Sequence, residues 1–82
     1  MISVSDVLND IKVVIRLEGK DKLTYELSND EALVIEVVDN AYGNLEISVE
    51  KLDEFGNTIE CATDDYDCSD ETLIAMIENA LF

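Results

Sequence analysis

Residues 32–39 (ALVIEVVD) constrain the fold of this chain more than any other segment. They are rich in β-branched residues and apolar on both sides of an alternating pattern, which is typical of a strand in the middle of a sheet. Turn-forming residues follow directly in the segment 40–44 (NAYGN), so the chain reverses there. We therefore predict a central strand over residues 32–39 and a turn after it.

Further segments alternate between apolar and polar residues, with the period of two that places every second side chain on one face of a strand. Turn signals separate them, beginning at Gly19 and again in residues 53–57 (DEFGN). Together they predict an antiparallel meander of about four to five strands. Besides residues 32–39, the predicted strands cover residues 11–18, 23–27, 45–50 and 58–63.

Both ends of the chain show helical spacing instead. Ser3 can act as an N-cap, and apolar residues recur at helical spacing over residues 3–11. Ser69 is a second N-cap candidate, and acidic residues follow it in the first turn, where the helix dipole favours negative charge. We predict helices over residues 3–11 and 70–82.

The fold class follows from combining these elements. Each helix has one apolar stripe and the sheet has one cleanly apolar face, so a two-layer α+β packing buries all three. We predict a single domain over residues 1–82, with the N-terminal and C-terminal helices packed on one face of the antiparallel sheet. The chain has no proline, repeat or linker-like segment that would indicate a second domain.

The charge of the chain is strongly unbalanced. It holds 20 acidic and 5 basic residues and no histidine, for a formal net charge of −15. Residues 1–22 contain both signs in equal number, so the excess lies in residues 23–82, where Lys51 is the sole base. Nucleic acids and anionic membranes bind through lysine and arginine, and the charge therefore argues against direct binding to either.

Alternation predicts a set of carboxylates on the sheet face opposite the leucine, isoleucine and valine side chains. With alternate residues about 6.8 Å apart along a strand and strands about 4.8 Å apart, this set forms a ladder facing solvent. Like charges facing each other destabilise a sheet, so we interpret the ladder as a binding surface for a basic protein groove. The alternative is a solvated face whose charge keeps the protein in solution. The predicted members are Glu26, Glu36, Glu46, Glu50 and Glu60.

A second acidic surface is expected in the segment 64–71 (DDYDCSDE). It does not match an EF-hand, because Asp70 stands where a loop counted from Asp65 needs glycine, which leaves at most weak, non-specific divalent binding. We interpret it either as a solvated loop or as a contact patch in which Tyr66 packs beside a guanidinium. The candidate partner-binding residues here are Asp64, Asp65, Tyr66, Asp67, Asp70 and Glu71.

The residue inventory gives no basis for catalysis. Histidine and tryptophan are absent and no nucleophile lies beside a base, so we expect no catalytic residue, metal or cofactor. Cys61 is expected as a buried reduced thiol on the inward side of the last strand and Cys68 in the loop after it, and whether the two can pair stays open. No secretory signal or run of about 18 apolar residues is present, so we expect a cytoplasmic protein.

The chain resembles small acidic phage-encoded DNA-mimic inhibitors, a class that includes anti-CRISPR and anti-restriction proteins. Its length, its excess of acid, the order of helix, sheet and helix, and the run Asp64-Asp65-Tyr66-Asp67 carry this resemblance. The resemblance implies a non-enzymatic inhibitor in the host bacterial cytoplasm. Such an inhibitor occupies the basic cleft of a defence nuclease, for example the PAM-reading cleft of a CRISPR effector.

A competing hypothesis is an immunity-type or adaptor protein that binds a basic toxin or another protein. Both hypotheses imply a basic protein partner, which in the first is a nucleic-acid-binding nuclease or its ribonucleoprotein complex. Neither involves direct binding to nucleic acid or to a membrane. We expect a monomer, or a weak homodimer formed through an exposed edge strand.

Overall fold

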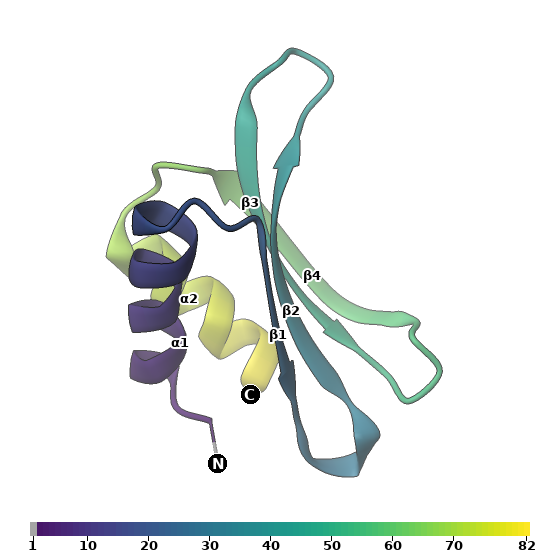
Figure 1. Cartoon of the computed structure of the whole chain (residues 1–82). Coiled ribbons are helices and arrows are strands. Elements are labelled where there is room, and N and C mark those ends of the chain that lie inside the picture. The colour runs from purple at the N-terminus through teal and green to yellow at the C-terminus, as the bar shows by residue number, and fades with distance from the viewer. Residues whose placement is uncertain (1) are drawn as a thin grey trace.

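Helices at both ends of the chain pack on one face of a four-stranded antiparallel sheet (Figure 1). The computed structural model describes residues 2–82. The sheet is a meander in the order β1-β2-β3-β4, so the predicted α+β class and its antiparallel topology are confirmed. Its strands are β1 (Lys22–Glu26), β2 (Ala32–Asp39), β3 (Leu45–Leu52) and β4 (Thr58–Asp65).

The two main helices begin at the caps that the sequence indicated. The side chain of Ser3 accepts a hydrogen bond from the backbone N–H of Asp6 and starts α1 (Val4–Asp10). In the same way Ser69 accepts from the backbone N–H of Thr72 and starts α2 (Asp70–Leu81). Between β1 and β2 the chain makes one short 3-10 turn, η2 (Ser28–Asp30).

The N-terminal helix is longer than predicted. Its helical path continues from α1 directly into a π-helix, η1 (Ile11–Leu17), because Ile11 keeps helical backbone angles at the junction. The predicted strand over residues 11–18 is therefore wrong. The meander has four strands, and its first strand begins after this helix.

Burial explains why this β-branched segment is helical. Val7, Ile11 and Ile15 form one buried ridge along the helix. From Val7 to Ile11 the chain is α-helical, and four residues make slightly more than one turn. From Ile11 to Ile15 it is π-helical, and four residues make slightly less than one turn. The two angular deviations have opposite sign, so the three side chains stay in line. A strand over residues 11–18 would place Ile15 and Leu17 on one face, yet Ile15 is 1% exposed and Leu17 80% exposed. Packing of the ridge thus overrides the local β pattern.

The predicted hairpin turn at Gly19 instead ends the helix. Gly19 has a φ of +80°, the left-handed conformation that glycine commonly adopts just after a helix. The backbone N–H of Glu18 donates to the Val13 carbonyl and that of Lys20 to the Val14 carbonyl. These bonds satisfy carbonyls of the last turn before the chain enters β1.

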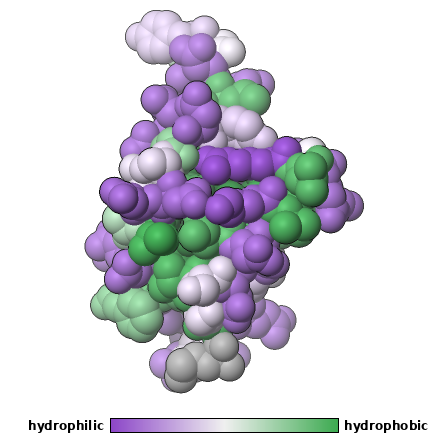
Figure 2. Space-filling view, turned by 90° about the vertical axis from the view of Figure 1, so that its left-hand side faces the viewer, coloured by the Kyte–Doolittle hydropathy of each residue, from purple (hydrophilic) through white to green (hydrophobic). Residues whose placement is uncertain are grey.

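The hydrophobic core lies between the helices and the sheet. In Figure 2, which looks at the helix-covered side, some hydrophobic side chains remain visible between hydrophilic ones. The opposite face of the sheet has no helix over it (Figure 1). The largest fully buried side chains come from the helices and from the sheet face beneath them, and they are Val7, Ile11, Ile15, Leu33, Ile35, Ile47, Val49, Leu73 and Ile77.

The register of β4 differs from the predicted one. Directly paired residues of neighbouring strands point to the same side of a sheet. Buried Val49 is paired with Ile35 on β2 and with Ala62 on β4, so Ala62 faces the helices. Its neighbour Cys61 therefore points to the open side, where it is exposed, and the prediction of a buried thiol is wrong.

A β-bulge causes this difference. Lys51 is paired with Glu60 while the next residue, Leu52, is paired with Thr58, which leaves Ile59 as the extra residue of the bulge. One extra residue inverts the facing of everything after it. Glu60 consequently lies on the helix side of the sheet, and its predicted place among the outward carboxylates is wrong.

Replacing Ile15 with alanine should lower the free energy of unfolding by about 2–5 kcal/mol, because it leaves a cavity in the core. Leu17→Ala is the matched control and should change it by less than about 0.5 kcal/mol, because that side chain is exposed. Urea unfolding followed by circular dichroism measures both values. Equal losses of unfolding free energy in the two variants would contradict the helix and would indicate that both residues lie on one face of a strand.

Tyr25 joins β1 to the N-terminal helix. Its hydroxyl donates a 2.7 Å hydrogen bond to Asp10 Oδ2. Burial raises the pKa of Tyr25 above its ordinary value of 10.0, and the Asp10 hydrogen bond and the negative charges of Asp10 and Asp6 raise it further. The native fold therefore favours the protonated phenol.

The stability that Tyr25 adds should disappear in alkaline solution. Because its pKa is higher in the folded chain than in the unfolded chain, the contribution is complete below pH 10.0 and decreases as the pH rises from there through the folded pKa. Tyr25→Phe should cost about 1–2 kcal/mol at neutral pH, and its difference from the parent protein should shrink in alkali. Urea unfolding of both proteins across this pH range tests the expectation. A difference that stays constant would contradict it.

Candidate protein-binding face

The uncovered face of the sheet carries carboxylates contributed by all four strands. The strand register places them on the same side of the sheet. Glu26 is paired with Ala32, and Ala32 and Glu36 are an even number of residues apart on β2. Glu46 and Glu50 lie two residues before and after Ser48, the partner of Glu36 on β3. Pairing with Glu46 places Asp65 on the same side. We call this set the acidic sheet face, and its members are Glu26, Glu36, Glu46, Glu50 and Asp65.

Four of these carboxylates surround one residue of β3. Glu36 is paired with Ser48, which stands between Glu46 and Glu50 along β3. Diagonal neighbours of this kind are about 7–8 Å apart, and the directly paired Glu46 and Asp65 have Cβ atoms about 4.5–5.5 Å apart. Ser48 is only 7% exposed on a face that no helix covers, so the surrounding side chains enclose it.

Basic residues are scarce on the acidic sheet face. At its paired positions within the described sheet, Lys22 is the single base, directly opposite Glu36. Elsewhere, Lys51 points to the helix side and lies 3.5 Å from Glu31. The acidic sheet face therefore keeps most of its negative charge uncompensated within the molecule.

The segment between β4 and α2 is held by the N-terminal helix. Arg16 Nη2 donates hydrogen bonds to the backbone carbonyls of Tyr66, at 3.0 Å, and Cys68, at 2.9 Å. Lys12 Nζ lies 2.8 Å from Asp70 Oδ2, and Arg16 Nη1 lies 4.0 Å from Asp70 Oδ1. We call these contacts the Arg16 clamp. They use the cations of η1 to fix a loop that is itself acidic.

The predicted partner-binding residues of segment 64–71 are thus dispersed. Asp65 belongs to the acidic sheet face, whereas Asp64 is paired with Ile47 and faces the helix side. Tyr66 packs against the hydrophobic core, and Asp70 is engaged by the Arg16 clamp. Exposed positions are also found at Asp67 and Glu71, away from the sheet. The structure does not gather this segment into one patch.

The two cysteines are free and occupy different environments. Cys61 lies beside the acidic sheet face, with its Sγ 3.7 Å from Glu50 Oε1 and 3.8 Å from Ser48 Oγ. Cys68 is half-buried under the Arg16 clamp. Burial raises the pKa of the Cys68 thiol, the charge of Asp64 adds to this shift, and Arg16 opposes it.

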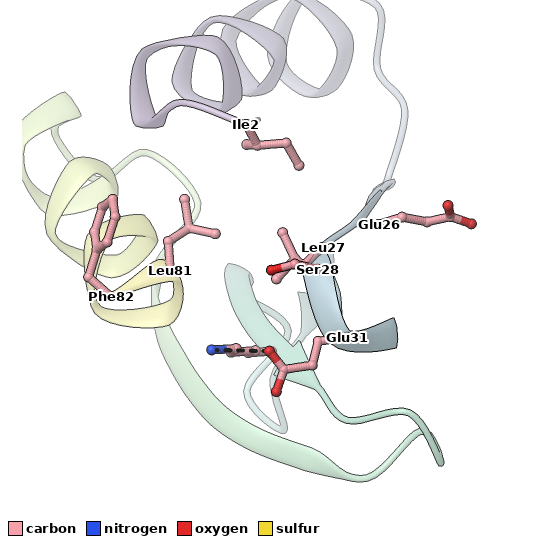
Figure 3. A pocket seen from close by; sticks show the side chains of 8 residues that line it. Ile2, Glu26, Leu27, Ser28, Glu31, Leu81 and Phe82 are labelled. Atoms are coloured by element: carbon pink, nitrogen blue, oxygen red, sulfur yellow. Dashed lines mark ion pairs between the residues drawn. The ribbon is translucent and has the colours of Figure 1, made fainter.

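A hollow of about 330 Å³ opens between both ends of the chain and the turn that joins β1 to β2 (Figure 3). Ile2, Leu27 and Leu81 point into it. Lys51 and Glu31, which form an ion pair, also line it. Its other lining residues are Glu26, Ser28 and Phe82. Among residues 2–82 no cluster of side chains is suited to hold a metal ion, and no helix in this part of the chain has the length and apolar character to span a membrane.

No protein family, curated protein or solved structure matches this chain.

Arg16→Met should lower the free energy of unfolding by about 1.5–3 kcal/mol, because methionine keeps the aliphatic packing but leaves two carbonyls without their charged donor. Lys12→Met, the matched control, removes an exposed ion pair and should cost less than about 1 kcal/mol. Thermal unfolding of the two variants measures the difference. Similar small losses in both would show that the two hydrogen bonds from Arg16 to backbone carbonyls do not hold the loop.

Proposed function

We propose that this protein is a non-enzymatic inhibitor that mimics DNA and occupies the basic nucleic-acid-binding cleft of a bacterial defence nuclease, foremost a CRISPR effector. One observation carries the proposal. The acidic sheet face presents carboxylates from four adjacent strands with Lys22 as the single base among them.

The arrangement of charge supports a binding role over a purely structural one. Like charges on directly paired strand residues, such as Glu46 and Asp65, destabilise a sheet by roughly 0.2–1 kcal/mol per pair. A surface selected for stability alone intersperses both signs. Here Lys12 and Arg16 instead compensate Asp70 on the helix side. The fold thus retains repulsion on the one face that no helix covers.

The geometry suits a cleft lined with arginine. Guanidinium groups pair with carboxylates through two parallel hydrogen bonds, as they do with phosphates and guanine edges. Acidic residues whose Cβ atoms are about 5–8 Å apart, such as those around Ser48, offer several such sites at once. PAM-reading clefts hold arginines for bases and further cations for the backbone. An acidic sheet face can therefore compete with duplex DNA for them.

The first test identifies the partner. The immobilised protein is exposed to bacterial extract at low salt, and bound proteins are eluted with duplex DNA and analysed by mass spectrometry. A nuclease or its ribonucleoprotein in the DNA eluate is the expected result. Proteins that salt releases but DNA does not would contradict mimicry and favour the immunity-type or adaptor alternative.

Charge-matched variants then test the face itself in a DNA-cleavage assay with the captured nuclease. Replacing Glu36, Glu46 and Glu50 with glutamine should weaken inhibition about tenfold or more, because several ion pairs of about 1 kcal/mol each are lost. The control replaces three exposed carboxylates outside the face in the same way, at Glu18, Glu54 and Glu78, and should retain inhibition. Equal losses in both variants would show that net charge acts without the acidic sheet face.

A further inference from the structure

β4 is the most solvent-exposed strand of the sheet, and one of its edges is unpaired. β4 pairs with β3 on one side and forms the end of the sheet on the other. Seven of its eight residues are exposed, Ala62 being the exception. The opposite edge strand, β1, has five residues, alternates between exposed and half-buried positions, and lies beside η1. An additional strand would therefore pair with β4 rather than with β1.

The backbone of β4 offers hydrogen-bonding groups at this edge. The backbone N–H of Tyr66 donates to the Leu45 carbonyl, which fixes the alternation of the antiparallel ladder. Tyr66 and every second residue before it direct their backbone groups toward β3. The residues between them, among them Cys61 and Thr63, direct their N–H and C=O groups away from β3. The N–H of Asp65 is engaged by the side chain of Asp64 at 2.7 Å. Cys61 and Thr63 are thus the central free positions.

The side chains flanking these positions decide what can pair with them. β4 contains neither lysine nor proline, the residues that commonly protect an edge strand. Glu60 and Asp64 stand on one side of the strand, on either side of Ala62, and Asp65 stands on the other. β4 itself therefore carries only negative charge, and the base paired with Glu60, Lys51 of β3, forms an ion pair with Glu31.

A second copy of the chain fits this edge poorly. In a two-fold antiparallel pairing centred on Ala62, Glu60 of one copy would lie opposite Asp64 of the other, and this repulsion would occur twice. Each copy also brings a net charge of −15. An extended segment with lysine or arginine at the corresponding places reverses both effects.

We propose that the free edge of β4 binds an extended basic segment of the partner protein as a fifth strand. Its residues opposite Cys61 and Thr63 exchange backbone hydrogen bonds with them, and its cations lie opposite Glu60 and Asp64. A small or β-branched residue lies between the cations, opposite Ala62. The inference rests on the proposed function in one respect, namely that the partner is basic, and it adds how part of that partner is held.

Nuclear magnetic resonance of the full ¹⁵N-labelled chain tests this with defined peptides. The probe is Arg-Thr-Val-Thr-Arg flanked by glycines. A first control carries N-methyl groups on both threonines, which keeps the charge but blocks strand pairing. A second control replaces both arginines with glutamate. We expect shifts confined to residues 59–65 with the probe, and amide exchange at Cys61 and Thr63 slowed about tenfold or more.

Each outcome has a distinct meaning. Weaker binding by about tenfold for both controls supports the fifth strand. If the N-methylated peptide binds as well as the probe, strand pairing is overturned while the preference for a basic partner stands. Equal binding of the glutamate peptide overturns the charge complementarity at this edge, whereas the proposed function rests on the acidic sheet face and is tested by the glutamine variants of that face. No binding of the probe, or a homodimer through β4 in sedimentation analysis, also overturns the proposal.

Discussion

The packing of one helical ridge against the sheet determines the rest of this structure. Val7, Ile11 and Ile15 form one hydrophobic core with sheet residues such as Ile35 and Val49 and with apolar side chains of α2. Because both helices lie on that side, the opposite face of the sheet stays open. Had residues 11–18 formed a strand, α2 would have been the main cover of a wider sheet. Because residues 11–17 are helical, the small chain has a closed core on one side of the sheet and an uncovered acidic sheet face on the other.

Local and global preferences agree in most of this fold, and there the sequence sufficed to predict it. The strand over residues 32–39 is apolar on both sides and central, and Ser69 caps a helix with a continuous apolar stripe. Residues 11–18 differ because two patterns overlap there. Alternation joins Ile15 to Leu17, whereas helical spacing joins Ile15 to Val7, and both partners are apolar. Choosing between them requires the sheet surface that the ridge covers, which no local window contains.

The acidic sheet face shows the same boundary between what is local and what is not. Alternation placed Glu26, Glu36, Glu46 and Glu50 on one side because their strands are regular. The bulge beside Lys51 and Leu52 removed Glu60 from that side, and a longer β4 added Asp65. The Arg16 clamp was also invisible in the sequence, since it joins residues about 50 positions apart. The positions of Glu60 and Asp65 depend on strand register and the Arg16 clamp on tertiary contacts, so the sequence pattern alone did not predict them.

Separation of charge across the sheet determines how the acidic sheet face acts in solution. The cations of Lys12 and Arg16 lie on the helix side, and packed layers are about 10 Å apart. At physiological salt the Debye length is about 8 Å, so these cations cancel little of the field in front of the open face. Within the face, Lys22 offsets one carboxylate and leaves the others to neighbours of like sign. The eight-residue ladder of β2 and β3 and the core behind it withstand this local repulsion. The basic partner that we propose would remove this repulsion on binding, and the repulsion present in the free sheet would then favour the complex.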